Sequence, residues 1–170
     1  MGKRLGILGA VTVVVALMVG AVSPALGSSS GASASASSGH ADGRTIRVIL
    51  VPTEAADIDL GAPGFSLGDT VVFGGVLQRP DGTPVGRYGL VCTFVSAANP
   101  AHVEAQCPTT ATLPGGQITT QGIVVNRALN TTLPITGGSG QFQGAGGQMV
   151  QRDISSGGQL KLELTFHLKF

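Results

Sequence analysis

Apolar side chains occupy every second position from residue 160 to residue 168, and polar or charged side chains fill the positions between them. A period of two places all the apolar side chains on one face of a strand, so this segment predicts a β-strand with one buried face. A weaker alternation of the same kind, through Ile46, Val48 and Leu50, predicts a first strand that stops at Pro52.

Six further segments have the pattern of strands, and most of them are separated by short turn sequences. The predicted strands are residues 70–78, 85–95, 103–113, 118–125, 131–136 and 141–152. The turn sequences, which carry the Pro, Gly, Asn or Asp that tight turns need, are RPDGTP at 79–84, AANPAH at 97–102, LPGGQ at 113–117 and SSGGQ at 155–159. Short connections favour antiparallel neighbours. The pattern therefore predicts an all-β fold, an eight-stranded antiparallel up-and-down β-barrel, which has no exposed strand edge; a β-sandwich is the alternative.

The first quarter of the chain differs from the rest. A basic start, MGKR, precedes an apolar run from Leu5 to Val22 and small residues suited to signal-peptidase cleavage. Residues 1–27 are predicted to be a signal peptide; an uncleaved membrane anchor is the alternative, because the run approaches the roughly 20 residues of a spanning helix. Residues 28–43, rich in Ser, Ala and Gly, are predicted to be a flexible linker. One domain, residues 44–170, remains, in a protein expected to be secreted and free of the membrane after cleavage.

The distribution of charge excludes some partners. The formal net charge is +1, only 11% of the residues are charged, and no Lys/Arg run follows the signal segment. Nucleic acid is therefore not an expected partner. The three histidines, at positions 40, 102 and 167, lack the spacing of metal ligands, and we expect neither a metal nor a cofactor.

A glycine-rich run, PITGGSGQFQGAGGQ, occupies residues 134–148. It is not predicted to bind phosphate, because a strand and not a helix follows it. The embedded Phe142 and Met149 argue against a linker. We interpret the run as a β-hairpin whose glycines serve a turn and close approaches between chains.

This hairpin and several other segments resemble the allene oxide cyclase and dirigent proteins. In the order of that family, the matching segments are SLGDTVVFGGVL at 66–77, VGRYGLVC at 85–92, VEAQC at 103–107, GGQITTQG at 115–122, LPITGGSGQFQGAGGQ at 133–148 and LKLELTFHL at 160–168. The resemblance covers residues 44–170 and is strongest to secreted bacterial members. It implies an eight-stranded barrel with an apolar lumen and a homotrimer.

The resemblance also implies chemistry for the lumen. The plant cyclases close a ring in an unstable fatty-acid allene oxide, and dirigent proteins orient phenolic radicals or quinone methides. The cyclase pattern has an acid in the first strand, for which Glu54 is an approximate counterpart, and an Asn just after a Phe, where this chain has Gly74 after Phe73. The dirigent hairpin has arginines where this chain has Gln143 and Gly146. Both catalytic sets are therefore incomplete here.

Several residues remain candidates for the site. The candidate general acids or bases follow the first strand and would act only at the barrel mouth; a solvated acidic loop is the alternative. An arginine on a strand is a candidate for holding an anionic or carbonyl group, or else is a solvated or interface residue. The catalytic candidates are Glu54, Asp57 and Arg87, and the ligand-binding candidates are Tyr88, Phe73 and Phe166.

Three functions fit these observations. The first is a secreted barrel that binds or orients a small apolar ligand, lipid-like or aromatic, in its lumen, as dirigent proteins do. The second is an isomerase or cyclase of the allene oxide cyclase type acting on a reactive small molecule, so whether the protein is an enzyme stays open. The third is a structural module whose lumen is filled by side chains. Outward apolar residues such as Val124 and Val95 are expected to need cover in the homotrimer.

The two cysteines are predicted to form a disulfide. A hairpin that turns at Asn99 and Pro100 places Cys92 and Cys107 directly opposite each other. Opposed residues lie close enough for a disulfide, and a secreted chain matures where such bonds persist. Two reduced, buried thiols are the alternative.

Overall fold

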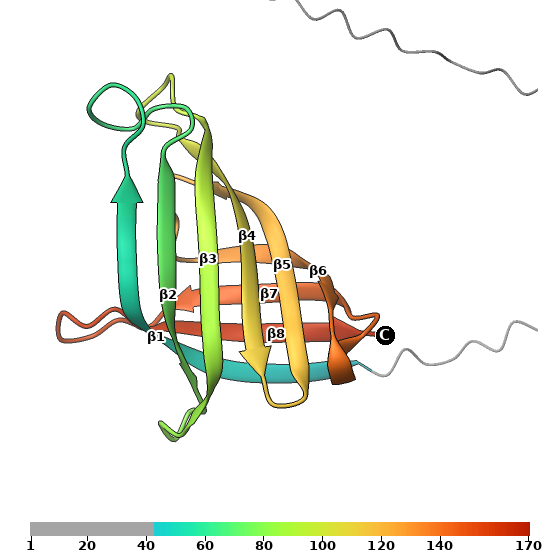
Figure 1. Ribbon diagram of the computed structural model, residues 1–170. Coiled ribbons are helices and arrows are strands. Elements are labelled where there is room, and N and C mark those ends of the chain that lie inside the picture. The colour runs from blue at the N-terminus through green and yellow to red at the C-terminus, as the bar shows by residue number, and fades with distance from the viewer. Residues whose placement is uncertain (1–42) are drawn as a thin grey trace, which may run out of the picture. The chain divides into compact units, whose positions relative to one another are not determined.

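A computed structural model describes residues 43–170, and these residues form a closed β-barrel (Figure 1). Its eight strands are antiparallel and pair in chain order, and the last strand pairs with the first. This confirms the predicted up-and-down barrel. The elements are β1 (Arg44–Ile58), β2 (Thr70–Gln78), β3 (Pro84–Ser96), β4 (Glu104–Leu113), β5 (Gly116–Val125), β6 (Thr131–Gly138), the 3-10 helix η1 (Gly140–Phe142), β7 (Gly146–Asp153) and β8 (Leu162–Lys169).

The predicted signal peptide, residues 1–27, and all of the predicted linker except Gly43 lie outside the described residues. Within residues 43–170, no helix has the length and hydropathy needed to cross a lipid bilayer.

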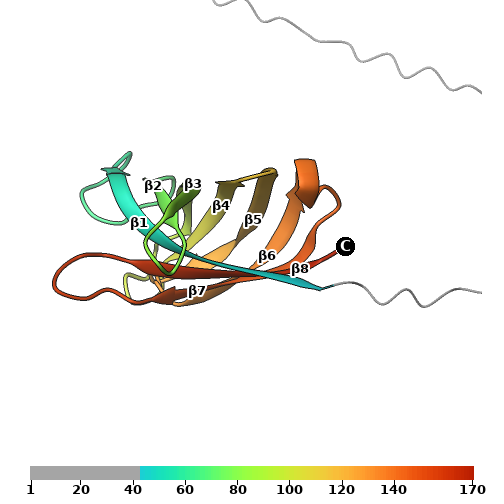
Figure 2. The ribbon, with the colours of Figure 1, turned by 90° about the horizontal axis from the view of Figure 1, so that it is seen from below.

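Strand β1 closes the barrel by pairing with two neighbours. Its residues 44–50 pair with β8, and its residues 49–58 pair with β2, so that β1 runs alongside β8 and then turns up along β2 (Figures 1 and 2). The prediction that this strand stops at Pro52 is wrong. The register shifts between Pro52 and Glu54, and such a bulge tolerates a residue that cannot donate to the ladder.

The loops after β1, β3, β5 and β7 share one end of the barrel, here called the mouth, because antiparallel strands alternate in direction. The opposite end, here called the floor, carries η1. The backbone N–H of Gln141 donates to the Gly115 carbonyl over 2.8 Å, which ties η1 to the β4–β5 turn. The side chain of Phe142 is 1% exposed, and the Arg44 guanidinium lies 5.5 Å from the centre of its ring. The prediction of one strand over residues 141–152 is therefore wrong at its start, where η1 closes the floor.

Side chains fill much of the barrel interior. The largest fully buried ones come from β1, β2, β5, η1, β7 and β8 and form one shared core: Leu50, Leu77, Ile118, Phe142, Met149, Leu164 and Phe166. These positions follow the period-2 pattern, with one side chain in every two directed inward. The part of the barrel interior that these side chains leave empty lies toward the mouth.

Candidate functional site

A cavity of about 180 Å³ lies inside the barrel and reaches the mouth. Its rim includes residues 127–129 of the β5–β6 loop, and its walls are mostly inward-facing apolar side chains of the strands. The apolar lining includes Val71, Phe73, Leu90, Phe94, Val124, Leu133, Leu160 and Leu162. An apolar cavity with few polar groups is the usual form of a small-molecule site.

Tyr88 supplies a buried hydroxyl group in the wall of this cavity. Its side chain is 3% exposed. Burial raises the pKa of Tyr88 to about 12, and the hydroxyl of Thr109, which favours the phenolate, offsets part of that rise. The Thr109 hydroxyl in turn lies 2.7 Å from that of Thr120. Tyr88 therefore stays neutral at physiological pH and keeps a proton that it can donate to a ligand.

Cys92 and Cys107 form a disulfide in the same wall, which confirms the prediction. Their Cα atoms are 4.2 Å apart. On both sides of the bond, β3 and β4 keep the register that a turn at Asn99 and Pro100 sets. The bond holds two cavity-lining strands together, and no free cysteine is present in residues 43–170.

Arg127 lies at the rim of the cavity. Its guanidinium group donates to a carboxylate oxygen of Asp57 over 3.3 Å and lies 5.7 Å from the centre of the Phe65 ring. The Phe65 ring stacks on the cavity-lining ring of Phe94, with 5.2 Å between their centres. The guanidinium group is therefore held above the apolar cavity by an aromatic face and one acid.

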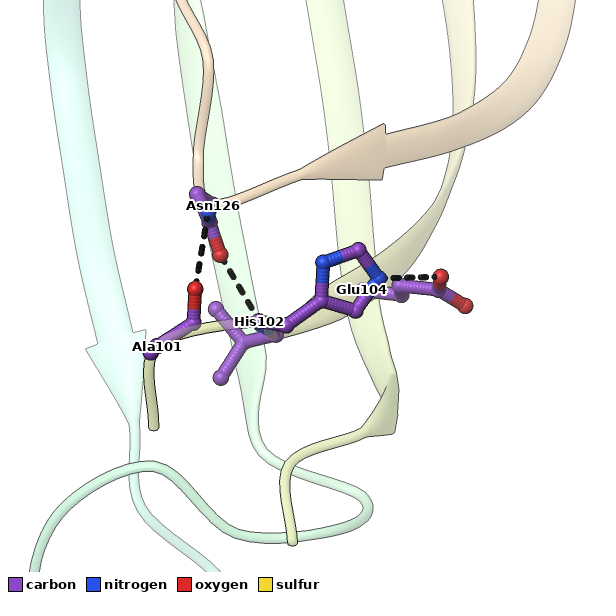
Figure 3. A network of polar contacts seen from close by, with 5 residues as sticks. Ala101, His102, Glu104 and Asn126 are labelled. Carbon is purple, nitrogen blue, oxygen red and sulfur yellow. Dashed lines mark hydrogen bonds and ion pairs between the residues drawn. The ribbon is translucent and has the colours of Figure 1, made fainter. Parts of the chain in front are cut away.

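Asn126 fixes the loop that carries Arg127 (Figure 3). Its side-chain oxygen accepts a hydrogen bond from the Val103 N–H over 2.9 Å, and its amide nitrogen donates to the Ala101 carbonyl over 3.2 Å. Asn126 and Arg127 both have positive φ angles, of 51° and 54°. Two successive non-glycine residues in this region are uncommon, and the hydrogen bonds of Asn126 to the β3–β4 loop keep them there.

The loop after β1 is organised by the carboxylate of Asp69. This carboxylate accepts hydrogen bonds from the backbone N–H groups of Leu60, over 2.9 Å, and Ser66, over 2.7 Å. These bonds, that of Leu60 first, hold the pKa of Asp69 below its usual range. The loop is thereby shaped so that Phe65 reaches the mouth.

A second concavity lies on the outer face of the barrel, over β1 to β4. It forms where Gly74 and Gly89 face each other without side chains, and Val72 and Val91 border it. Glu54, which pairs with Gly74, lies at its edge. This groove is open to solvent, so it lacks the enclosure that a small apolar ligand needs.

The structure places the predicted site residues in different surroundings. Tyr88 and Phe73 line the cavity together, whereas Phe166 is fully buried in the packed core. Arg87 is exposed next to the buried Tyr88 and therefore faces outward. Of the two acids, Asp57 is exposed at the mouth beside Arg127, and Glu54 is exposed on the outer face.

Sequence reasoning missed Arg127 and Asn126, which shape the mouth. The sequence feature that could have identified them is an Asn directly after a predicted strand, because Asn tolerates a positive φ and so marks a turn. The expectation that Val124 faces outward is wrong, since Val124 pairs with the inward Ala105 and lines the cavity. In the described part of the chain, no three His, Cys, Asp or Glu side chains gather closely enough to hold a metal ion.

Residues 49–165 match the family of the allene oxide cyclase barrel-like domain. The match spans well over half of the chain, which therefore belongs to this family. A search of curated proteins finds no match.

Among solved structures, a pyocyanin demethylase is 27% identical, with 71% of this chain and 98% of that chain covered and a TM-score of 0.63. An exo-specific intermolecular Diels–Alderase is 15% identical, with 75% and 98% covered and a TM-score of 0.60. A pterocarpan synthase dirigent protein is 14% identical, with 75% and 84% covered and a TM-score of 0.60. At these low identities, the last two likenesses concern the fold alone.

Proposed function

We propose that this protein binds a small apolar ligand, aromatic or lipid-like, in the mouth cavity and fixes the orientation of that ligand. The cavity itself carries the proposal, because its walls are mostly apolar and the buried hydroxyl group of Tyr88 in the wall offers a hydrogen-bond donor to a ligand. The names of the similar structures support it, since a pyocyanin demethylase, a Diels–Alderase and a dirigent protein all refer to small organic molecules.

The polar groups of the cavity favour orientation over acid–base catalysis. Among the described residues that line it, none is Asp, Glu or His. A reaction that moves a proton near neutral pH needs a group whose pKa lies near that pH, and the pKa of Tyr88 is about 12. A binding protein, by contrast, needs only walls that fix the ligand and a donor that fixes one of its polar atoms.

A cyclase or isomerase is the second candidate, and the Tyr88 hydroxyl is the observation that favours it. A ring closure in which no proton moves needs a fixed geometry of the reacting atoms. A neutral, buried hydroxyl that donates to a substrate carbonyl adds electrostatic stabilisation in a site that excludes water. Such an enzyme would be an isomerase that uses Tyr88 as a hydrogen-bond donor.

The fluorescence of Tyr88 provides a direct test of ligand binding. The chain has one tyrosine and no tryptophan, so its tyrosine emission comes from the cavity wall alone. We expect 2-naphthamide, a neutral two-ring molecule, to quench this emission saturably. Ala105→Phe, which places a ring in the cavity, should abolish the quenching, whereas Ala98→Phe in the exposed β3–β4 loop should leave it unchanged.

Two results would count against the proposal. One is the absence of saturable quenching in the parent protein. The other is equal quenching in the parent and in an Ala105→Phe variant whose circular dichroism shows an intact barrel. Because overpacking itself destabilises a core, Ala105→Met serves as a milder second variant.

We also propose that the mature protein is secreted after removal of residues 1–27, with residues 28–43 as a linker to the barrel. The disulfide between Cys92 and Cys107 supports an oxidising compartment. The mass of the protein recovered from the culture medium tests this: a mass that includes residues 1–27 would contradict cleavage.

A further inference from the structure

We propose that the ligand of the cavity carries an acidic group, which Arg127 binds at the mouth while the apolar part of the ligand occupies the cavity. The ligand class is a compact organic acid, such as an aromatic carboxylate of one or two rings. This inference rests on the proposed function, because it requires a ligand in the cavity.

The position of Arg127 is the first reason. Its side chain lines the cavity and is 46% exposed, so it borders both the apolar interior and the solvent. A ligand acid at this point would contact the guanidinium group and keep part of its hydration. The loop is held by the hydrogen bonds of Asn126 to the β3–β4 loop, so the site is organised before the ligand arrives.

The partners of Arg127 leave it free to bind an anion. Its one carboxylate contact, with Asp57 over 3.3 Å, is an ion pair in which Asp57 is 69% exposed. Exposed ion pairs contribute little to stability and yield readily to a competing acid. A guanidinium group has five N–H donors in a planar fork that suits a carboxylate, and the described cavity lining holds no acid that would oppose an anionic ligand.

The size of the cavity restricts the apolar part of the ligand. An apolar cavity of about 150 Å³ in another protein holds benzene, and the cavity here has about 180 Å³. A body of one or two rings fits this space, and a long fatty-acyl chain exceeds it. Apolar walls with aromatic residues such as Phe73 and Phe94 suit a flat ring.

The test compares two ligands of the same shape, 2-naphthoate and 2-naphthamide, by titration calorimetry at neutral pH. We expect the parent protein to bind naphthoate about tenfold more tightly than naphthamide, as a charge-assisted hydrogen bond implies. Arg127→Met should abolish this preference by weakening naphthoate binding alone, and Arg127→Lys should keep part of it. Arg79→Met is the matched control, because Arg79 is exposed in the β2–β3 turn at the floor and should leave both affinities unchanged.

Asp57→Asn gives a second variant that removes the competing acid and keeps the cation. It should strengthen naphthoate binding and leave naphthamide binding unchanged. If naphthamide binds and naphthoate binds no more tightly, or if Arg127→Met leaves the preference intact, the acidic ligand is wrong and the proposed binding function stands. If neither molecule binds, both proposals fail.

Discussion

At the scale of single residues, Tyr88 combines a buried position with a hydroxyl group that a ligand can reach. It is the only tyrosine in the protein, so its ionisation can be observed without interference from another phenol. Its neighbours are known as well, since the Thr109 hydroxyl interacts with it and with that of Thr120. The state of this one side chain therefore reports on the cavity wall.

We predict that ionisation of Tyr88 lowers the free energy of unfolding of the barrel at alkaline pH. The phenol ionises near pH 10 in an unfolded chain and at about 12 in the folded protein. The folded state therefore binds the phenol proton more tightly than the unfolded state does. The free energy of unfolding keeps this contribution below pH 10 and loses it as the pH rises from 10 to 12. The shift corresponds to a loss of up to about 3 kcal/mol of unfolding free energy.

The measurement is urea unfolding at a series of pH values, together with the absorbance of the phenolate. The phenolate absorbance of the folded protein should rise at a pH about two units higher than that of the unfolded protein. Tyr88→Phe is the control, because it keeps the ring and removes the ionisable hydroxyl group, and it should lack the part of the loss that Tyr88 causes. Equal titration of the folded and unfolded protein would show that the phenol is not buried.

At this scale the sequence identified residues whose role depends on strand register and missed those that depend on loop shape. Cys92 and Cys107 were found because a hairpin of known turn position fixes which residues oppose each other. Arg127 was missed because its place at the rim results from two positive φ angles and from the Asn126 contacts, which no alternation of apolar residues encodes.

At the scale of the elements, the bulge in β1 decides where Glu54 points. In the first half of β1, Val48 and Leu50 face inward, and uninterrupted alternation would direct Glu54 inward too. The register shift after Pro52 reverses the faces, so that Ala55 pairs with the inward Phe73. A shift of one residue moves every later side chain to the other face, and a bulge of this kind leaves no mark in the hydrophobic pattern.

The glycine-rich hairpin between β6 and β7 shows why glycine is needed at one particular position. Gly147 has a φ of 106°, and a Cβ atom there would lie 2.1 Å from the carbonyl oxygen of His167 on β8. Gly144 has a φ of 80°, but a Cβ atom there would meet nothing within 4 Å. The two glycines therefore separate the effect of backbone conformation from the effect of a steric clash.

We predict that Gly147→Ala lowers the free energy of unfolding by about 3 kcal/mol or more, because it adds a clash to a strained backbone. Gly144→Ala is the matched control and should lower it by about 1 kcal/mol, from conformation alone. Urea unfolding of both variants checks the difference. Similar losses in the two variants would mean that β7 does not approach β8 as closely as the structure shows.

At the scale of the whole molecule, the barrel could be predicted because apolar and polar residues alternate regularly along its strands. Eight alternating segments joined by short turns leave few other ways to remove strand edges. The cavity could not be predicted in the same way, because its volume is the space left over after large side chains such as Phe142 and Met149 fill the rest of the interior. That remainder depends on packing and not on pattern.

Exposed apolar residues on the outer surface of the barrel lead us to predict that three copies of the chain associate. Apolar side chains on the outer faces of β2, β3 and β5 remain exposed, among them Val72, Val91, Val95 and Ile123, and Val72 pairs directly with Val91. Clustered exposed apolar residues mark an interaction surface, and the family resemblance implies a homotrimer. We therefore expect light scattering of the barrel at micromolar concentration to give three times the mass of one chain.

Val91→Glu should convert this trimer to a monomer, because it places a charge among apolar residues that association would bury. Ile154→Glu is the control, since Ile154 is 40% exposed in the β7–β8 loop, away from these strands, and should leave the trimer intact. Ligand binding offers a further check: because the cavity is built within one barrel, the Val91→Glu monomer should still bind 2-naphthamide. A parent protein that is already monomeric at this concentration would refute the trimer and leave the cavity argument untouched.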